Sequence, residues 1–154
     1  MIDVNVYPKF ISHEKCDYIL KHALKTFQID SRTHHGWYAR TNINLKFENE
    51  VKVLLRDISP FNKFNISWIN LTEYENNRSL DLHKDGRSDF TFTIPLTDDY
   101  EGGDFLIEDD IYKLNKGDCI CFNGNQLKHG VSKVTSGYRA ALNIWTKPIA
   151  NSII

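Results

Sequence analysis

A β-strand with two chemically different faces is indicated by the stretch GYRAALNIWTK, residues 137–147. Side chains at positions i and i+2 of a strand point to the same face of a sheet. One face is therefore apolar or aromatic, from Tyr138 to Ile144, and the other is mixed. The mixed face consists of Arg139, Ala141, Asn143 and Trp145. An arginine on the inner face of a small barrel is costly to bury without an anionic partner, so this strand predicts a ligand site as well as a sheet.

Seven earlier segments share the composition and length of this strand. They are short, rich in β-branched and aromatic residues, and separated by Gly, Asn and Asp. Their ranges are 63–74, 81–85, 89–96, 103–109, 111–114, 117–124 and 127–134. Together they predict a mainly β (α+β) fold, a double-stranded β-helix or jelly roll of about eight strands. Within it, the acidic stretch 98–110 is predicted to form a hairpin that turns at Gly102 and Gly103.

The N-terminal part of the chain has a helical pattern instead. A first helix is predicted over residues 12–27, with Ser12 as its cap and an apolar face at helical spacing. That face comprises Cys16, Ile19, Leu20, Ala23, Leu24 and Phe27. A second amphipathic helix is predicted from Phe47 to Ile58, ended by Pro60, and the segment 30–45 is predicted as a loop with a strand at its end. We expect both helices to cover one sheet from outside.

One domain is expected over residues 1–154, with helical support at about 12–60 and the jelly-roll core at about 64–147. The charge is nearly balanced, at 19 basic and 20 acidic residues, which argues against binding of duplex nucleic acid. No apolar run approaches the roughly 20 residues that span a bilayer, and the first ten residues do not have the pattern of a signal peptide. The cysteines are too few for a disulfide framework, and Cys119 and Cys121 are interpreted as strand thiols. We therefore expect a cytoplasmic protein without a membrane partner, and the sequence makes no prediction about its oligomeric state.

A candidate metal site comes from the stretch SLDLHKDGRSDF, residues 79–90. His83 and Asp85 lie two residues apart in a predicted strand, so their side chains share a face. His129 is the other histidine of the strand-rich part and supplies a third ligand. Two histidines and one carboxylate suit non-haem Fe(II) and leave positions open for a bidentate co-substrate and O2. Zinc accepts the same ligands, so a zinc hydrolase remains an alternative, as does an exposed His beside an Asp in a polar loop.

Arg139, ten residues after His129, favours iron over zinc. No acidic residue lies on its own strand, so a carboxylate of a ligand is a suitable partner for its guanidinium group. A dicarboxylic 2-oxo acid fits this arrangement, because its 2-oxo acid end would chelate iron while its far carboxylate meets Arg139. Zinc hydrolysis gives no reason for an arginine at this place.

The pattern H-x-D followed by H-x-V-x-x-V-x-x-G-x-R resembles the 2-oxoglutarate- and Fe(II)-dependent dioxygenase superfamily, in its prolyl 4-hydroxylase-like branch. The resemblance runs from about Trp68 to Trp145. It implies that His83, Asp85 and His129 are the catalytic iron ligands, and that Arg139 binds the distal carboxylate of 2-oxoglutarate. The cofactors that it implies are Fe(II), 2-oxoglutarate as co-substrate and O2, with ascorbate as a reductant.

Further roles follow from the same resemblance. Tyr74, Phe105 and Asn143 would contact the co-substrate, and Trp145 would lie on the substrate side. Packing in the core is the alternative for the three aromatic residues. In the segment 31–42, Trp37 and Arg40 are candidate substrate residues, because loops on rigid scaffolds often determine specificity. These last two rest on composition alone.

The implied reaction is the oxidative decarboxylation of 2-oxoglutarate to succinate and CO2, coupled to hydroxylation of a substrate C–H bond. The expected substrate is a peptide or protein side chain. Three departures from the prolyl hydroxylase pattern, at Asn76–Asn77, Leu80 and Pro95, put proline itself in doubt. Two alternatives stay open: the same chemistry on a small molecule such as a free amino acid or a modified nucleobase, and a non-catalytic metal-binding jelly roll.

Overall fold

The computed structural model describes residues 4–23, 27–32, 38–43, 45–75, 77–86 and 89–148. The helices in this part of the chain are α1 (His13–Ala23), α2 (Leu45–Leu55) and the short 3-10 helix η1 (Phe61–Lys63). The strands before the first candidate ligand are β1 (Asn5–Tyr7), β2 (Phe27–Arg32), β3 (Tyr38–Ile43) and β4 (Phe64–Tyr74). The later ones are β5 (Leu80–His83), β6 (Phe90–Pro95), β7 (Tyr100–Gly102), β8 (Phe105–Ile107), β9 (Asp110–Tyr112), β10 (Cys119–Phe122), β11 (His129–Val131), β12 (Val134–Gly137) and β13 (Arg139–Pro148).

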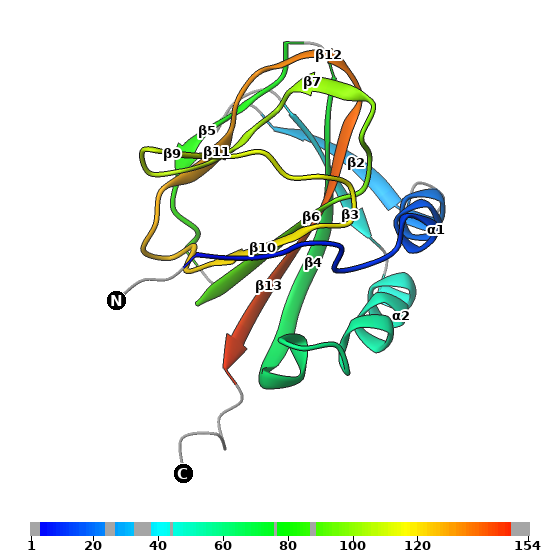
Figure 1. Cartoon of the computed structure of the whole chain (residues 1–154). Helices are drawn as coiled ribbons and strands as arrows, with labels where there is room; N and C mark the ends of the chain where they lie inside the picture. The colour runs from blue at the N-terminus through cyan, green and yellow to red at the C-terminus, as the bar shows by residue number, and fades with distance from the viewer. Residues whose placement is uncertain are drawn as a thin grey trace.

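Two antiparallel sheets make up most of the molecule (Figure 1). The larger has seven strands in the order β1-β10-β6-β13-β4-β3-β2, and the smaller has four in the order β5-β11-β8-β9. Strands β12 and β7 form a separate two-stranded sheet. Figure 1 shows α1 and α2 on the side of the large sheet that faces away from the small one. This arrangement confirms the predicted jelly roll with N-terminal helices packed on one sheet.

The main core lies between the helices and the outer face of the large sheet. Ile19 of α1 and Val51 of α2 are fully buried with Leu142 of β13. Burying such a side chain stabilises the fold by about 1.5–3 kcal/mol. Cys119 and Cys121 are buried in the same core and carry free thiols. This agrees with their interpretation as strand thiols. Burial raises the pKa of the Cys121 thiol to about 12, which keeps it protonated.

The helix predictions are right in type and wrong at their ends. Ser12 caps α1 as expected, since its Oγ accepts a hydrogen bond from the backbone N–H of Lys15 at 3.1 Å. The helix ends at Ala23, however, and Phe27 begins a strand. The segment predicted as mostly loop holds the hairpin β2–β3, which is stabilised by pairing with β4. Because that pairing partner lies some thirty residues away in the chain, local helical spacing was misleading. The second helix also begins and ends earlier than predicted.

The predicted hairpin over residues 98–110 is wrong. Strand β7 pairs with β12, whereas β8 pairs with β11 and β9, so the glycines join two sheets instead of two partner strands. Gly102 has φ +73°, and a Cβ there would overlap the carbonyl oxygen of Lys133. Gly103 has φ +64°, and its Cβ would lie 2.9 Å from Cδ of Arg139. The two glycines are thus explained by close approach to β12 and to Arg139 as well as by their turn geometry.

No helix in the described part of the chain is long and apolar enough to cross a membrane.

Candidate functional site

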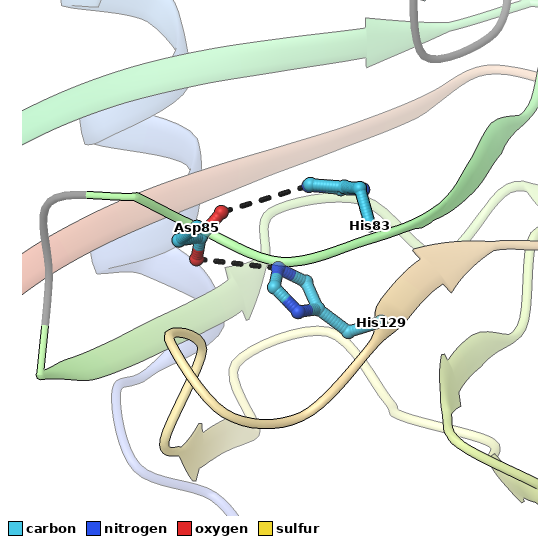
Figure 2. A group of neighbouring side chains, drawn as sticks. All are labelled: His83, Asp85 and His129. Carbon is cyan, nitrogen blue, oxygen red and sulfur yellow. Dashed lines mark ion pairs between the residues drawn. The ribbon is translucent and has the colours of Figure 1, made fainter.

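Three potential metal ligands converge where β5 ends beside β11 (Figure 2). His83 is the last residue of β5 and His129 the first of β11, and the two are directly paired in the antiparallel register. Their ring centroids lie 4.5 Å apart. Asp85 follows β5, and its backbone N–H donates to the carbonyl oxygen of Gly124 at 2.7 Å. The sheet register thus brings His129 beside His83 and Asp85, which lie 44 or more positions earlier in the chain. These are the three ligands that the sequence predicted.

The atoms that meet at the centre of this group are all electron-pair donors. Nε2 of His83 lies 3.6 Å from Oδ1 of Asp85, and Nε2 of His129 lies 3.2 Å from Oδ2. The Nδ1 atom of each ring lies within 2.9 Å of a backbone carbonyl oxygen, that of Asp81 or Leu127. A carbonyl only accepts, so each Nδ1 carries a hydrogen and each Nε2 faces the carboxylate. In the neutral form of either ring, that Nε2 holds the lone pair that a metal ion would accept. A cation between them satisfies all three groups.

The described ligand atoms lie within 4.8 Å of one another, and the residues could hold a metal ion. Burial opposes ionisation of the Asp85 carboxyl, but hydrogen bonds from His129, His83 and Thr91 outweigh it and lower the pKa. For His83, burial favours the neutral ring, but hydrogen bonds to Asp85 and to the Asp81 carbonyl raise its pKa overall. Both pKa shifts have the same cause, which is that the Asp85 carboxylate stays ionised and attracts positive charge. Two imidazoles and one carboxylate are a ligand set suited to Fe(II).

Two residues that the sequence did not single out hold Asp85 in place. Thr91 on β6 donates from its Oγ1 to Oδ2 of Asp85 at 2.7 Å. Gly124 leaves room for that contact, because a Cβ there would overlap both Oδ2 of Asp85 and Oγ1 of Thr91. Threonine alternates with apolar residues all along β6, so no sequence signal distinguished Thr91 from Thr93.

Replacing Thr91 with valine is expected to lower the affinity for Fe(II) by about 10- to 100-fold, because the carboxylate loses the donor that orients it. Anaerobic titration with Fe(II) in competition with a chelator measures this affinity. Thr93→Val on the same strand is the matched control, because the Thr93 hydroxyl donates to Asn143 and not to Asp85. An unchanged affinity in Thr91→Val would show that Asp85 does not need this hydrogen bond.

A cavity of about 850 Å³ opens beside the three ligands and extends along β4 and β13. Arg139 lines it and is only 1% exposed. Its Nε donates to the carbonyl oxygen of Gly103 at 3.2 Å, and its guanidinium carbon lies 5.0 Å from the centre of the Tyr74 ring. Among the described residues, no carboxylate lies within 4.0 Å of the guanidinium group. A buried cation of this kind is ready to receive an anionic ligand.

The cavity also brings together most of the other residues singled out in the sequence. Tyr74, Phe105, Asn143 and Trp145 all line it. The Phe105 ring stacks on His129 with centroids 6.3 Å apart, and Trp145 stacks on Trp68 at 4.7 Å. Contact of these residues with a co-substrate or substrate stays a prediction.

Asn143 belongs to a hydrogen-bond network on the wall of the cavity. Its Nδ2 donates to Asn70 Oδ1 at 3.1 Å and to Thr72 Oγ1 at 3.0 Å, and its Oδ1 accepts from Thr93. The amide is therefore held by neighbouring strands. Of the two candidates in the segment 31–42, Trp37 lies outside the described residues. Arg40 lies in β3, and its side chain is likewise outside the described part.

A jelly roll with two histidines, one carboxylate and a buried arginine in one cavity defines an oxygenase class, and comparison with known proteins supports it. The profile of the 2OG-Fe(II) oxygenase superfamily matches residues 69–147, just over half of the chain. The chain therefore belongs to the 2OG-Fe(II) oxygenase superfamily.

One curated relative is a PKHD-type hydroxylase from Prochlorococcus marinus (strain AS9601), 37% identical over 100 residues. The match covers 57% of this chain and 45% of the relative, so the chain spans about half the length of that protein. A viral collagen prolyl hydroxylase from Paramecium Bursaria Chlorella virus-1, solved as a 2OG complex, has a TM-score of 0.65 at 18% identity, covering 95% of this chain and 96% of that one. HygX from Streptomyces hygroscopicus, solved with nickel, 2-oxoglutarate and hygromycin B, has a TM-score of 0.72 at 11% identity, covering 97% and 84%.

Proposed function

We propose that this chain is a 2-oxoglutarate- and Fe(II)-dependent oxygenase that hydroxylates a C–H bond of a peptide or protein side chain. The observation that carries the proposal is a buried arginine, without a described anionic partner, in the same cavity as three converging metal ligands. Similarity to a PKHD-type hydroxylase and to a viral collagen prolyl hydroxylase supports hydroxylation and a peptide substrate.

The residues fit Fe(II), because two imidazole Nε2 atoms and one ionised carboxylate converge on the position of a cation. Bound Fe(II) would supply O2 activation coupled to oxidative decarboxylation of 2-oxoglutarate, with succinate and CO2 as products. Arg139 would bind the distal carboxylate of the co-substrate, and the Tyr74 ring beside the guanidinium would keep it oriented. Phe105 and Phe122, packed against His129, would exclude water from the ligands.

A second candidate is the same reaction on a small molecule. It is favoured by the likeness to HygX, whose structure holds hygromycin B beside 2-oxoglutarate. The cavity volume of about 850 Å³ is in the range of sites that enclose a small ligand.

Two measurements test the proposal. Anaerobic addition of 2-oxoglutarate to the Fe(II)-loaded protein should produce a weak visible absorption band, as expected for a 2-oxo acid chelated to iron at an open site. Under air, succinate formation should then rise with a peptide pool and not with a panel of free amino acids, nucleosides and aminoglycosides. No band in folded, iron-replete protein would contradict the oxygenase proposal. Stimulation by the small molecules alone would replace the peptide with the second candidate.

A further inference from the structure

The cavity extends along β13 from Arg139 past Trp145, which is paired with the Thr91 that holds Asp85. On β13, Trp145 lies six residues and Lys147 eight residues after Arg139, and all three line the cavity. At about 3.3 Å per residue, they lie roughly 20 Å and 26 Å from Arg139 along the strand. A five-carbon dicarboxylate held between Arg139 and the metal ligands leaves this outer part, the cavity mouth, for the substrate.

A flat apolar surface forms one wall of the cavity mouth. Trp68 of β4 and Trp145 of β13 are opposite each other in the antiparallel register, and their rings stack at 4.7 Å with 24° between the planes. The register shifts just after this pair, and Ser67 donates from its Oγ to the carbonyl oxygen of Trp145 at 2.9 Å. Trp68 remains 38% exposed. A stacked pair that the backbone holds in place presents its ring surface to an incoming side chain at little entropic cost.

Among the described residues that line the cavity, the cationic side chains outnumber the acidic ones. Lys84, between His83 and Asp85 in the chain, and Lys147 both line the cavity and are exposed. Neither forms an ion pair with a carboxylate of the described residues. Asp85 is the one acidic residue among the described cavity-lining side chains. The two positive charges of Fe(II) would be balanced by the two negative charges of 2-oxoglutarate. The excess of cationic side chains over Asp85 would therefore persist when both are bound.

We propose that the substrate is an acidic peptide, which rests an apolar or ring side chain on the Trp68–Trp145 pair and places carboxylates at Lys84 and Lys147. This inference rests on the proposed function and adds the substrate's charge to it. A neutral peptide would leave the charges of the two lysines unbalanced, and a basic peptide would be repelled by them. Aspartate or glutamate beside the target residue would instead be attracted to the cavity mouth. Lys84 and Lys147 are thus specificity-determining residues.

The test is selection from a pool of random hexapeptides by immobilised protein loaded with Fe(II) and 2-oxoglutarate, without O2. The composition of retained peptides is read by sequencing. Aspartate and glutamate should be enriched by about two- to fivefold per contacting position, a range typical of solvent-exposed ion pairs. The enrichment should fall in 0.5 M salt, where exposed charges are screened. The double variant Lys84→Gln/Lys147→Gln should abolish it, and Lys147→Glu should shift retention toward lysine and arginine.

Lys21→Gln is the matched control, because Lys21 is exposed on α1, on the other side of the large sheet, and should leave the selection unchanged. Retained peptides with the composition of the input pool would overturn the inference, as would an acidic enrichment that survives in the double variant, or no retention at all. The 2-oxoglutarate absorption band, recorded on the same protein before selection, separates the two levels. Loss of the band contradicts the proposed function, whereas a normal band without acidic enrichment contradicts the acidic substrate alone.

Discussion

Alanine in place of His129 is expected to lower the affinity for Fe(II) by about 100-fold or more and to abolish the visible band with 2-oxoglutarate. The imidazole is one of three groups that converge on the candidate metal position, 3.2 Å from the Asp85 carboxylate. Loss of a residue that merely supports a ligand commonly costs 10- to 100-fold, so loss of a ligand itself should reach at least the upper end. Anaerobic Fe(II) titration in competition with a chelator measures the affinity directly.

His129 is also 5% exposed and packs against Phe122, so alanine leaves a cavity and lowers stability. Asp85→Asn separates the two effects, because asparagine keeps the size of the side chain while it removes the charge. It should weaken Fe(II) binding by a similar factor with a smaller loss of stability. His13→Ala, at the exposed start of α1, is the histidine control and should bind Fe(II) like the unchanged protein. Normal Fe(II) affinity in both His129→Ala and Asp85→Asn would rule out this metal site.

The features that could be predicted from the sequence are those that depend on the repeat of side-chain directions within a single strand. Alternation over β13 correctly placed Arg139, Asn143 and Trp145 on one face, because the two-residue repeat of a strand needs no knowledge of its partners. The spacing of His83 and Asp85 indicated shared orientation for the same reason. Both predictions depended on neighbouring positions in a single element.

The features that could not be predicted depend on which strands pair. The hairpin β2–β3 is stabilised by β4, and β7 pairs with β12 some thirty residues further along, so neither partner is visible locally. The same limit applies to the site. Thr91 reaches Asp85 across strands, and Trp68 meets Trp145 only through the register of β4 with β13. The cavity mouth, with its stacked indoles and lysines, therefore emerges only from the tertiary structure.

Methionine in place of Arg139 is expected to raise the dissociation constant of 2-oxoglutarate by about 10- to 150-fold, with Fe(II) affinity unchanged. The range corresponds to the roughly 1.5–3 kcal/mol that a hydrogen bond to a charged group contributes. The guanidinium is buried in the cavity and has no described carboxylate partner, so a ligand carboxylate is its natural complement. Methionine keeps much of the length and apolar stem of arginine, which limits the loss of packing. The measurement is the 2-oxoglutarate titration of the visible band in the Fe(II)-loaded variant.

Two comparisons make the result specific for carboxylate recognition. Arg139→Lys keeps the charge and loses the planar fork, so its affinity for 2-oxoglutarate should fall between those of the unchanged protein and the methionine variant. Pyruvate, a 2-oxo acid without a distal carboxylate, should bind weakly and equally to the unchanged protein and to Arg139→Met. A structural role of Arg139 would instead weaken both ligands by the same factor, because a distorted cavity does not distinguish them. Equal losses for 2-oxoglutarate and pyruvate would therefore remove Arg139 from co-substrate recognition and assign it to the packing between Gly103 and Tyr74.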